Sequence, residues 1–275
     1  MQSNTPERFQ TLKSLIVQGA KDFSRVEGHI LAAGLAHFAI LSIVPFLMFG
    51  TSLLEWLPGK SSATDMPEAY EAVARPIRAF LPVVDADLAQ QVRGLVSTSK
   101  LSGITGLAAV LISASLFLSG LQHSLHNIFK PNTPRRGIIK KKLIVLGFVV
   151  FAVLLMAGIQ LLWSVLPPDA TVVLQSVFSS FVLTMAFVIS IYWFGSRQLN
   201  QKNVLVGALF FCLFWNLALV CFRIYLDMNG SFSKIYGTLA GIAILMIWVY
   251  YASIIFIGAC CLVNSLEKRR IHPDK

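Results

Sequence analysis

The sequence predicts an all-α integral membrane protein with six transmembrane helices, cytoplasmic N and C termini, an amphipathic N-terminal helix and a helical extracytoplasmic cap. Two observations lead to this fold class. The chain of 275 residues is 56% hydrophobic and only 13% charged, whereas a soluble domain has about 25% charged residues. Its apolar runs are each long enough to cross about 30 Å of hydrocarbon as a helix. A water-soluble fold is therefore excluded.

A strongly basic segment, residues 130–142, determines the predicted orientation. Its sequence, KPNTPRRGIIKKK, holds six Lys and Arg residues and no acid between two apolar runs. Because loops rich in Lys and Arg stay in the cytoplasm, this segment is expected inside. With that choice, 16 of the 23 Lys and Arg residues fall in predicted inner segments and six in outer ones. Topology thus explains the net charge of +10, and nucleic acid is not expected as a partner.

Residues 1–29 are predicted to form an amphipathic cytoplasmic helix. Thr5 and Pro6 suit a helix N-terminus, and the apolar residues that follow recur at helical spacing with Lys and Arg between them. Two interpretations remain open. The helix lies on the inner membrane surface, held by anionic lipids, or it packs on the protein's own loops.

A membrane domain is predicted over residues 30–264. Pro45, near the middle of the first span, is expected to bend that helix. Residues 55–102 hold amphipathic stretches broken by prolines, which predicts an outer cap folded onto the membrane. Residues 265–275 are predicted to be a basic cytoplasmic tail. The six spans are expected at about 30–54, 103–128, 143–166, 172–194, 204–226 and 236–264.

Two polar residues in the fifth span are candidates for a substrate path, because polar groups are costly in hydrocarbon. Asn216 lies about 18 Å into the span, near the bilayer midplane. Its alternative role is a hydrogen bond that holds two helices together. Arg223, seven residues later, is a candidate contact for an anionic group. Its alternative is to extend to the outer interface and pair with Asp227.

Three further candidates, His37, Gln122 and His123, lie near the inner side of the first two spans. They form either one polar cluster or separate packing contacts. The sequence predicts no metal site and no cofactor, and the four cysteines are expected to be packed thiols. Gly237 and Gly241 form a GxxxG pair at the start of the sixth span, which predicts close helix packing.

Three stretches resemble a known family in order and spacing. They are LAHFAILSIVP at 35–45, SLHNIF at 124–129 and YGTLAGIAILMIWVYYASIIFIGACCLV at 236–263. Together they resemble the BrkB/YihY family of bacterial inner-membrane proteins, whose old label is ribonuclease BN. The resemblance covers about residues 31–264 and implies a six-span helical bundle in the inner membrane. Two positions depart from the family pattern, with His37 in place of a tyrosine and Cys260 in place of an acid.

The predicted function is that of a transporter or flippase-like protein for an amphipathic or anionic substrate, and no enzymatic activity is expected. A ribonuclease would need metal ligands or a general base. The cytoplasmic acids lie near the termini in no motif spacing: Glu7, Asp22, Glu27, Glu267 and Asp274. The alternative function is a membrane scaffold or envelope-homeostasis factor that acts through protein partners at the outer cap. A homo-oligomer is compatible with either function.

Overall fold

The computed structural model describes residues 17–55, 103–130, 168–194, 199–228 and 240–271. Within these residues the chain is helical, and no strand is found. The long helices are α2 (Gly28–Glu55), α5 (Gly103–Phe129), α7 (Pro168–Phe194), α8 (Gln201–Met228) and α10 (Ala240–Ile271). The all-helical fold class is therefore confirmed for the described part of the chain.

Several of these helices are able to cross a membrane by length and composition. The described residues contain three such segments: Ala108–Phe129, Gln201–Leu226 and Ile242–Ile271. Val17–Arg25 and Gly28–Ile43 qualify together, with a bend of 68° between them, and Ser180–Phe194 is a shorter apolar helix. The predicted third span, 143–166, and nearly all of the predicted cap lie outside the described residues. The six-span topology thus stays a prediction.

The observed helices extend beyond several predicted bounds. α7 begins at Pro168 rather than at residue 172, in keeping with the preference of proline for the first turn of a helix. α10 continues beyond the predicted end of the sixth span to Ile271, and it buries Ser265 and Glu267 in its last turns. Most of the predicted basic tail is therefore the end of this helix. Pro45 lies inside α2, which continues through it as one helix.

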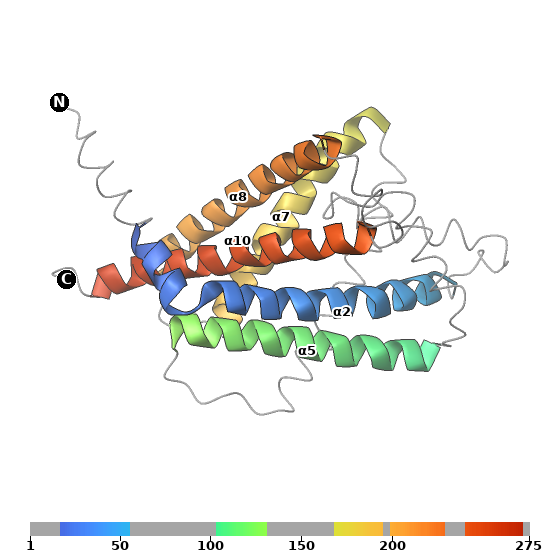
Figure 1. The fold of residues 1–275 in the computed structure, drawn as a ribbon, viewed down its shortest axis with the longest axis horizontal. Coiled ribbons are helices and arrows are strands. Elements are labelled where there is room, and N and C mark those ends of the chain that lie inside the picture. The colour runs from blue at the N-terminus through green and yellow to red at the C-terminus, as the bar shows by residue number, and fades with distance from the viewer. Residues whose placement is uncertain (1–16, 56–102, 131–167, 195–198, 229–239, 272–275) are drawn as a thin grey trace.

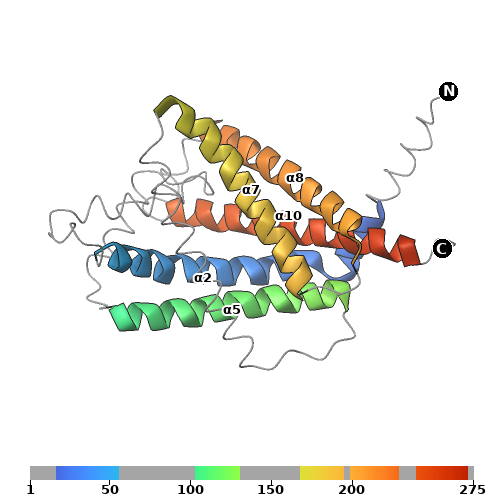
Figure 2. The same cartoon turned by 180° about the vertical axis from the view of Figure 1, so that it is seen from behind.

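α10 occupies the centre of the bundle. It packs against α2 on one side and α8 on the other, while α5 packs along α2 and α7 packs against α8 (Figure 1). Seen from behind, α7 crosses α10 obliquely (Figure 2). The start of α2, the end of α5, the start of α8 and the end of α10 lie toward the same end of the bundle (Figure 1). We call this the basic end, after its described Lys and Arg residues: Lys21, Arg25, Lys130, Lys202, Lys268, Arg269 and Arg270.

Two glycines allow neighbouring helices to approach closely. A Cβ atom on Gly207 of α8 would lie 2.1 Å from Cγ2 of Val263 in α10, and one on Gly120 of α5 would lie 2.7 Å from Cδ2 of Phe38 in α2. Close helix packing is the role that was predicted from the sequence for Gly237 and Gly241. Gly237 lies outside the described residues, and Gly241 lies in the first turn of α10.

Candidate functional site

An apolar cavity of about 330 Å³ lies among all five long helices. Aromatic side chains of α7, α8 and α10 form much of its wall, among them Phe187, Trp215 and Trp248. Apart from tryptophan indoles, the polar side chains of its described lining are Ser190 and Ser253. Each serine hydroxyl donates to a backbone carbonyl one turn earlier in its own helix, at 2.6 and 2.8 Å. The cavity therefore presents a surface similar to hydrocarbon.

The cavity lies well inside the bundle rather than at its basic end. Its lining begins with Leu35 and Ala39 of α2, Phe117 and Leu121 of α5, and Phe211 of α8. At 1.5 Å per residue, these positions are about 10 to 20 Å from the ends of α2, α5 and α8 at the basic end, whereas on α7 the lining extends to the last residue of the helix, Phe194. Two lining residues of α7, Ile189 and Trp193, are exposed. The cavity therefore reaches the outer surface of the bundle beside α7.

Asn216 lies at the contact between α7 and α8. Its Oδ1 accepts a hydrogen bond from Ser180 Oγ at 3.0 Å, and its Nδ2 donates to the carbonyl oxygen of Cys212 at 2.8 Å. This is the geometry of the helix-packing alternative, because the amide joins two helices and does not line the apolar cavity. The preceding residue, Trp215, is the one that lines the cavity.

The other candidates from the sequence are spread over the bundle. Arg223 is exposed on α8, and the side chain of Asp227 lies outside the described part. His37 is exposed and contacts the ring of Phe38 edge-on. Within the described residues, no hydrogen bond joins His37 to the candidates on α5.

Those two α5 candidates lie near the basic end of the helix. Gln122 is half-buried, and His123 is exposed with its Nε2 3.1 Å from Nδ2 of Asn127. The structure therefore brings none of the five predicted substrate-path residues together by a direct polar contact. No group of three His, Cys, Asp or Glu side chains that could hold a metal ion occurs in the described ranges.

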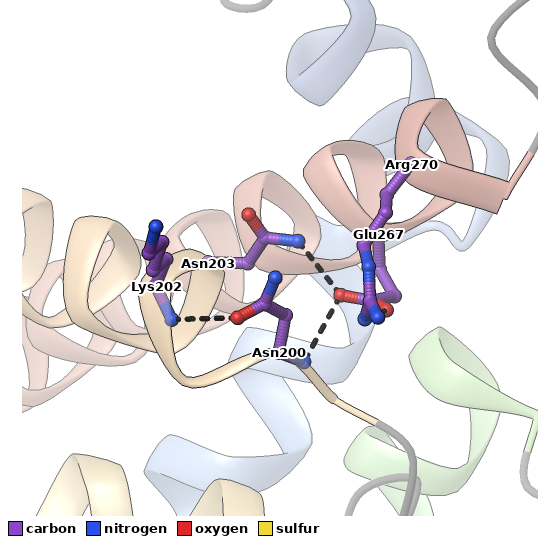
Figure 3. A network of polar contacts seen from close by, with 5 residues as sticks. All are labelled: Asn200, Lys202, Asn203, Glu267 and Arg270. Atoms are coloured by element: carbon purple, nitrogen blue, oxygen red, sulfur yellow. Dashed lines mark hydrogen bonds and ion pairs between the residues drawn. The ribbon is translucent and has the colours of Figure 1, made fainter.

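A buried acid at the basic end, Glu267, was not predicted as a site residue. It is 7% exposed, and its Oε2 accepts hydrogen bonds from the backbone N–H of Asn200 at 3.2 Å and from Nδ2 of Asn203 at 2.7 Å. Its Oε1 pairs with Arg270 at 2.9 Å (Figure 3). Asn200 in turn caps α8, because its Oδ1 accepts from the backbone N–H of Lys202 at 3.1 Å. Glu267 thus fixes the start of α8 to the end of α10.

A second buried acid, Asp22, connects the segment before α2 to the end of α10. It is 6% exposed, and both of its carboxylate oxygens lie 2.8 Å from Nζ of Lys268. Ser265 Oγ donates to the same carboxylate at 3.5 Å. The described part of the predicted amphipathic segment therefore packs on the end of α10. An acid and a base three residues apart indicate the Glu267–Arg270 pair in the sequence, but the contacts between helices carry no such signal.

An apolar helical bundle with a hydrocarbon-like cavity and polar contacts at one end is an α-helical membrane protein. The family model described as Virulence factor BrkB matches residues 20–274, so the chain belongs to the BrkB family. This confirms the resemblance carried by the three short stretches of sequence.

Three named relatives align with most of the chain. It is 27% identical to the ribonuclease-like protein YfkH of Bacillus subtilis, over 90% of this chain and 94% of that protein. It is 24% identical to a UPF0761 membrane protein of Pseudoalteromonas atlantica, over 88% of this chain and 82% of that protein. A UPF0761 membrane protein of Tolumonas auensis is 27% identical, over 84% of this chain and 78% of its own length. No solved structure matches the chain.

Cys260, where the sequence resemblance leads one to expect an acid, is fully buried in the core. The following residue, Cys261, is also fully buried, and all four cysteines are free thiols. A buried thiol packs as a small apolar group. Cys260 therefore contributes an apolar contact inside the bundle.

Proposed function

We propose that this protein is a transporter or flippase-like protein of the bacterial inner membrane that moves an amphipathic substrate. The apolar cavity is the observation that carries this proposal. A cavity that is lined by hydrocarbon-like side chains and reaches the membrane-facing surface takes up an acyl chain more favourably than water. Its volume of about 330 Å³ falls in the range of small-molecule sites, about 300–1,000 Å³.

The proposal assigns the apolar part of the substrate to the cavity and its polar part to an aqueous edge of the bundle. A charged headgroup inside the cavity would lose its hydration without gaining polar partners. Asn216 acts in this account as a helix-packing residue, and its neighbour Trp215 as part of the cavity wall. The proposal keeps the predicted six spans, with both termini in the cytoplasm.

We propose a non-enzymatic role for the acids at the basic end. A general base needs a carboxylate that can reach its substrate. In the described residues, Asp22 is engaged by Lys268, and Glu267 by Arg270 and the start of α8. The ribonuclease-like name of YfkH belongs to that protein, and these contacts favour a structural role for Asp22 and Glu267 in this chain.

Reconstitution into liposomes tests the proposed function. Purified protein is incorporated with a fluorescent phospholipid, and a membrane-impermeant quencher measures how much of the lipid exchanges between leaflets. We expect exchange to be faster than in protein-free liposomes and to increase with the amount of protein. The opposite result is that the protein exchanges no lipid, whatever the headgroup, although it restores normal growth to a deletion strain. That result would favour the scaffold alternative.

A further inference from the structure

A second pocket, of about 350 Å³, opens at the basic end. It lies between the segment that precedes α2, the end of α5 and the end of α10. Unlike the apolar cavity, it is lined by charged and amide side chains together with apolar ones. We call it the basic-end pocket.

Two cations of the basic-end pocket are available to a ligand. Arg25 and Lys130 are exposed and enter from different elements, and neither forms an ion pair with an acid in the described residues. The third cation, Lys268, is held by Asp22 through two contacts of 2.8 Å. Asp22 is therefore already neutralised and does not oppose an anion bound between Arg25 and Lys130.

An amide group adds a hydrogen-bond donor. Asn264 of α10 is half-buried in the lining, and its side chain makes no hydrogen bond to any residue that the structure describes. The side-chain amide of Asn264 is therefore free to donate a hydrogen bond to a ligand in the pocket. The pocket thus combines a guanidinium, an ammonium and a free amide donor.

The backbone turns sharply at two places in the same lining. Glu27 has φ 52° and Lys130 has φ 43°, and these are the non-glycine residues with positive φ in the described chain. Positive φ at such residues is unfavourable and is often retained where it positions functional groups. Both turns lie in the lining of the pocket, and at Lys130 the turn ends α5, with the backbone N–H of Lys130 donating to the carbonyl oxygen of His126 at 2.9 Å.

We infer that the basic-end pocket binds the phosphate group of an organic phosphate ester. Arg25 presents a planar fork of N–H donors that suits phosphate oxygens, Lys130 supplies a compact positive charge, and Asn264 supplies a neutral donor. Glu27, the exposed acid of the lining, suits an ester that also carries a hydroxyl or ammonium donor. Such chemistry is found both in phospholipid headgroups and in soluble phosphate esters.

The interpretation of this pocket as a substrate site depends on the proposed transport function, to which it adds a site for the polar part of the substrate. The pocket and the apolar cavity share α5 and α10. Along α5 the lining of the pocket begins at Asn127 and that of the cavity ends at Leu121, a separation of about 10 Å. A phosphate bound in the pocket would therefore leave an attached acyl chain within reach of the cavity.

Binding measurements on purified full-length protein test the inference independently of transport. Titrations with phosphatidylglycerol in mixed micelles and with glycerol 3-phosphate, each followed by thermophoresis, compare the two sources of the phosphate ester. We expect Arg25→Gln and Lys130→Gln each to weaken binding about tenfold, since each removes a charge-assisted contact. Lys202→Gln is the matched control, because it removes an exposed cation from the same end outside the pocket, and we expect it to leave binding unchanged.

The two titrations also decide the source of the phosphate. Binding of the lipid alone assigns the pocket to a headgroup, and binding of both ligands assigns it to phosphate esters in general. No binding of either ligand, or equal weakening by Lys202→Gln, would overturn the inference. Binding without lipid exchange would support the phosphate site and refute the proposed transport function. Lipid exchange that is unchanged by Arg25→Gln and Lys130→Gln would support transport and refute the pocket as its substrate site.

Discussion

Gly207 of α8 and Val263 of α10 lie so close that a single methyl group at position 207 would come within 2.1 Å of Cγ2 of Val263. Val263 is fully buried, and a valine in a helix strongly prefers one side-chain rotamer. The contact therefore has little room to adjust. It brings the backbones of the two helices together beside the polar contacts of Glu267.

Gly207→Ala is predicted to destabilise the protein by about 1–3 kcal/mol, because it overpacks this contact. Gly34→Ala is the control, since a Cβ on Gly34 would meet no atom within 4 Å and alanine favours the helix. Unfolding by SDS in mixed micelles measures both effects. Adding Val263→Ala to Gly207→Ala should recover part of the loss. Equal stability of the two glycine variants would contradict the close contact.

Glu267→Ala is predicted to lower the free energy of unfolding by about 1–3 kcal/mol, since it leaves the partly buried N–H donors of Asn200 and Asn203 without their acceptor. The same titration applied to Asn203→Ala and to the double variant tests the coupling. We expect the double variant to lose less than the sum of the two single losses. Gln201→Ala changes an exposed neighbour and should be neutral. Strict additivity would show that Glu267 does not hold α8 through Asn203.

Asn216→Leu and Ser180→Ala are each predicted to lower stability by about 1 kcal/mol, as expected for one hydrogen bond between membrane helices. At matched protein amounts, both variants should exchange lipid at the rate of the wild type. Loss of exchange in Asn216→Leu with unchanged stability would instead return Asn216 to the substrate path.

Single cysteines at the two ends of α8 test the predicted orientation. Lys202 is exposed at the basic end, and Met228 is 79% exposed at the opposite end. In spheroplasts, a membrane-impermeant maleimide should label Met228→Cys, whereas Lys202→Cys should react only after lysis. The labelling of wild type, with its four native cysteines, gives the background. The opposite labelling pattern would reverse the topology.

The apolar runs predicted the existence of the described helices because hydrocarbon requires each spanning segment to satisfy its own backbone hydrogen bonds. Their ends were less predictable. α10 continues through charged residues to Ile271, since Glu267 and Lys268 find partners on α8 and on the segment before α2. Such partners do not follow from the local sequence.

The site was harder to predict than the helices. A helix that is apolar all round has no clear face in its sequence, so the contacts of Asn216 with Ser180, and of Gly207 with Val263, depended on how the helices pack. For the same reason, the apolar cavity could not be predicted from the sequence. The pairing of Asp22 with Lys268 could not be predicted because the two residues are remote along the chain, and the contacts of Glu267 with Asn200 and Asn203 could not because they belong to another part of the bundle.

Filling the apolar cavity tests the central claim most directly. Ala252 of α10 lines the cavity, and Ala252→Phe would occupy it, whereas Ala33→Phe makes the same change at an exposed position of α2. Lipid exchange is measured in liposomes that contain equal amounts of folded protein. We predict that Ala252→Phe abolishes most of the exchange and that Ala33→Phe retains the wild-type rate. Exchange at the wild-type rate by Ala252→Phe would contradict a substrate path through this cavity.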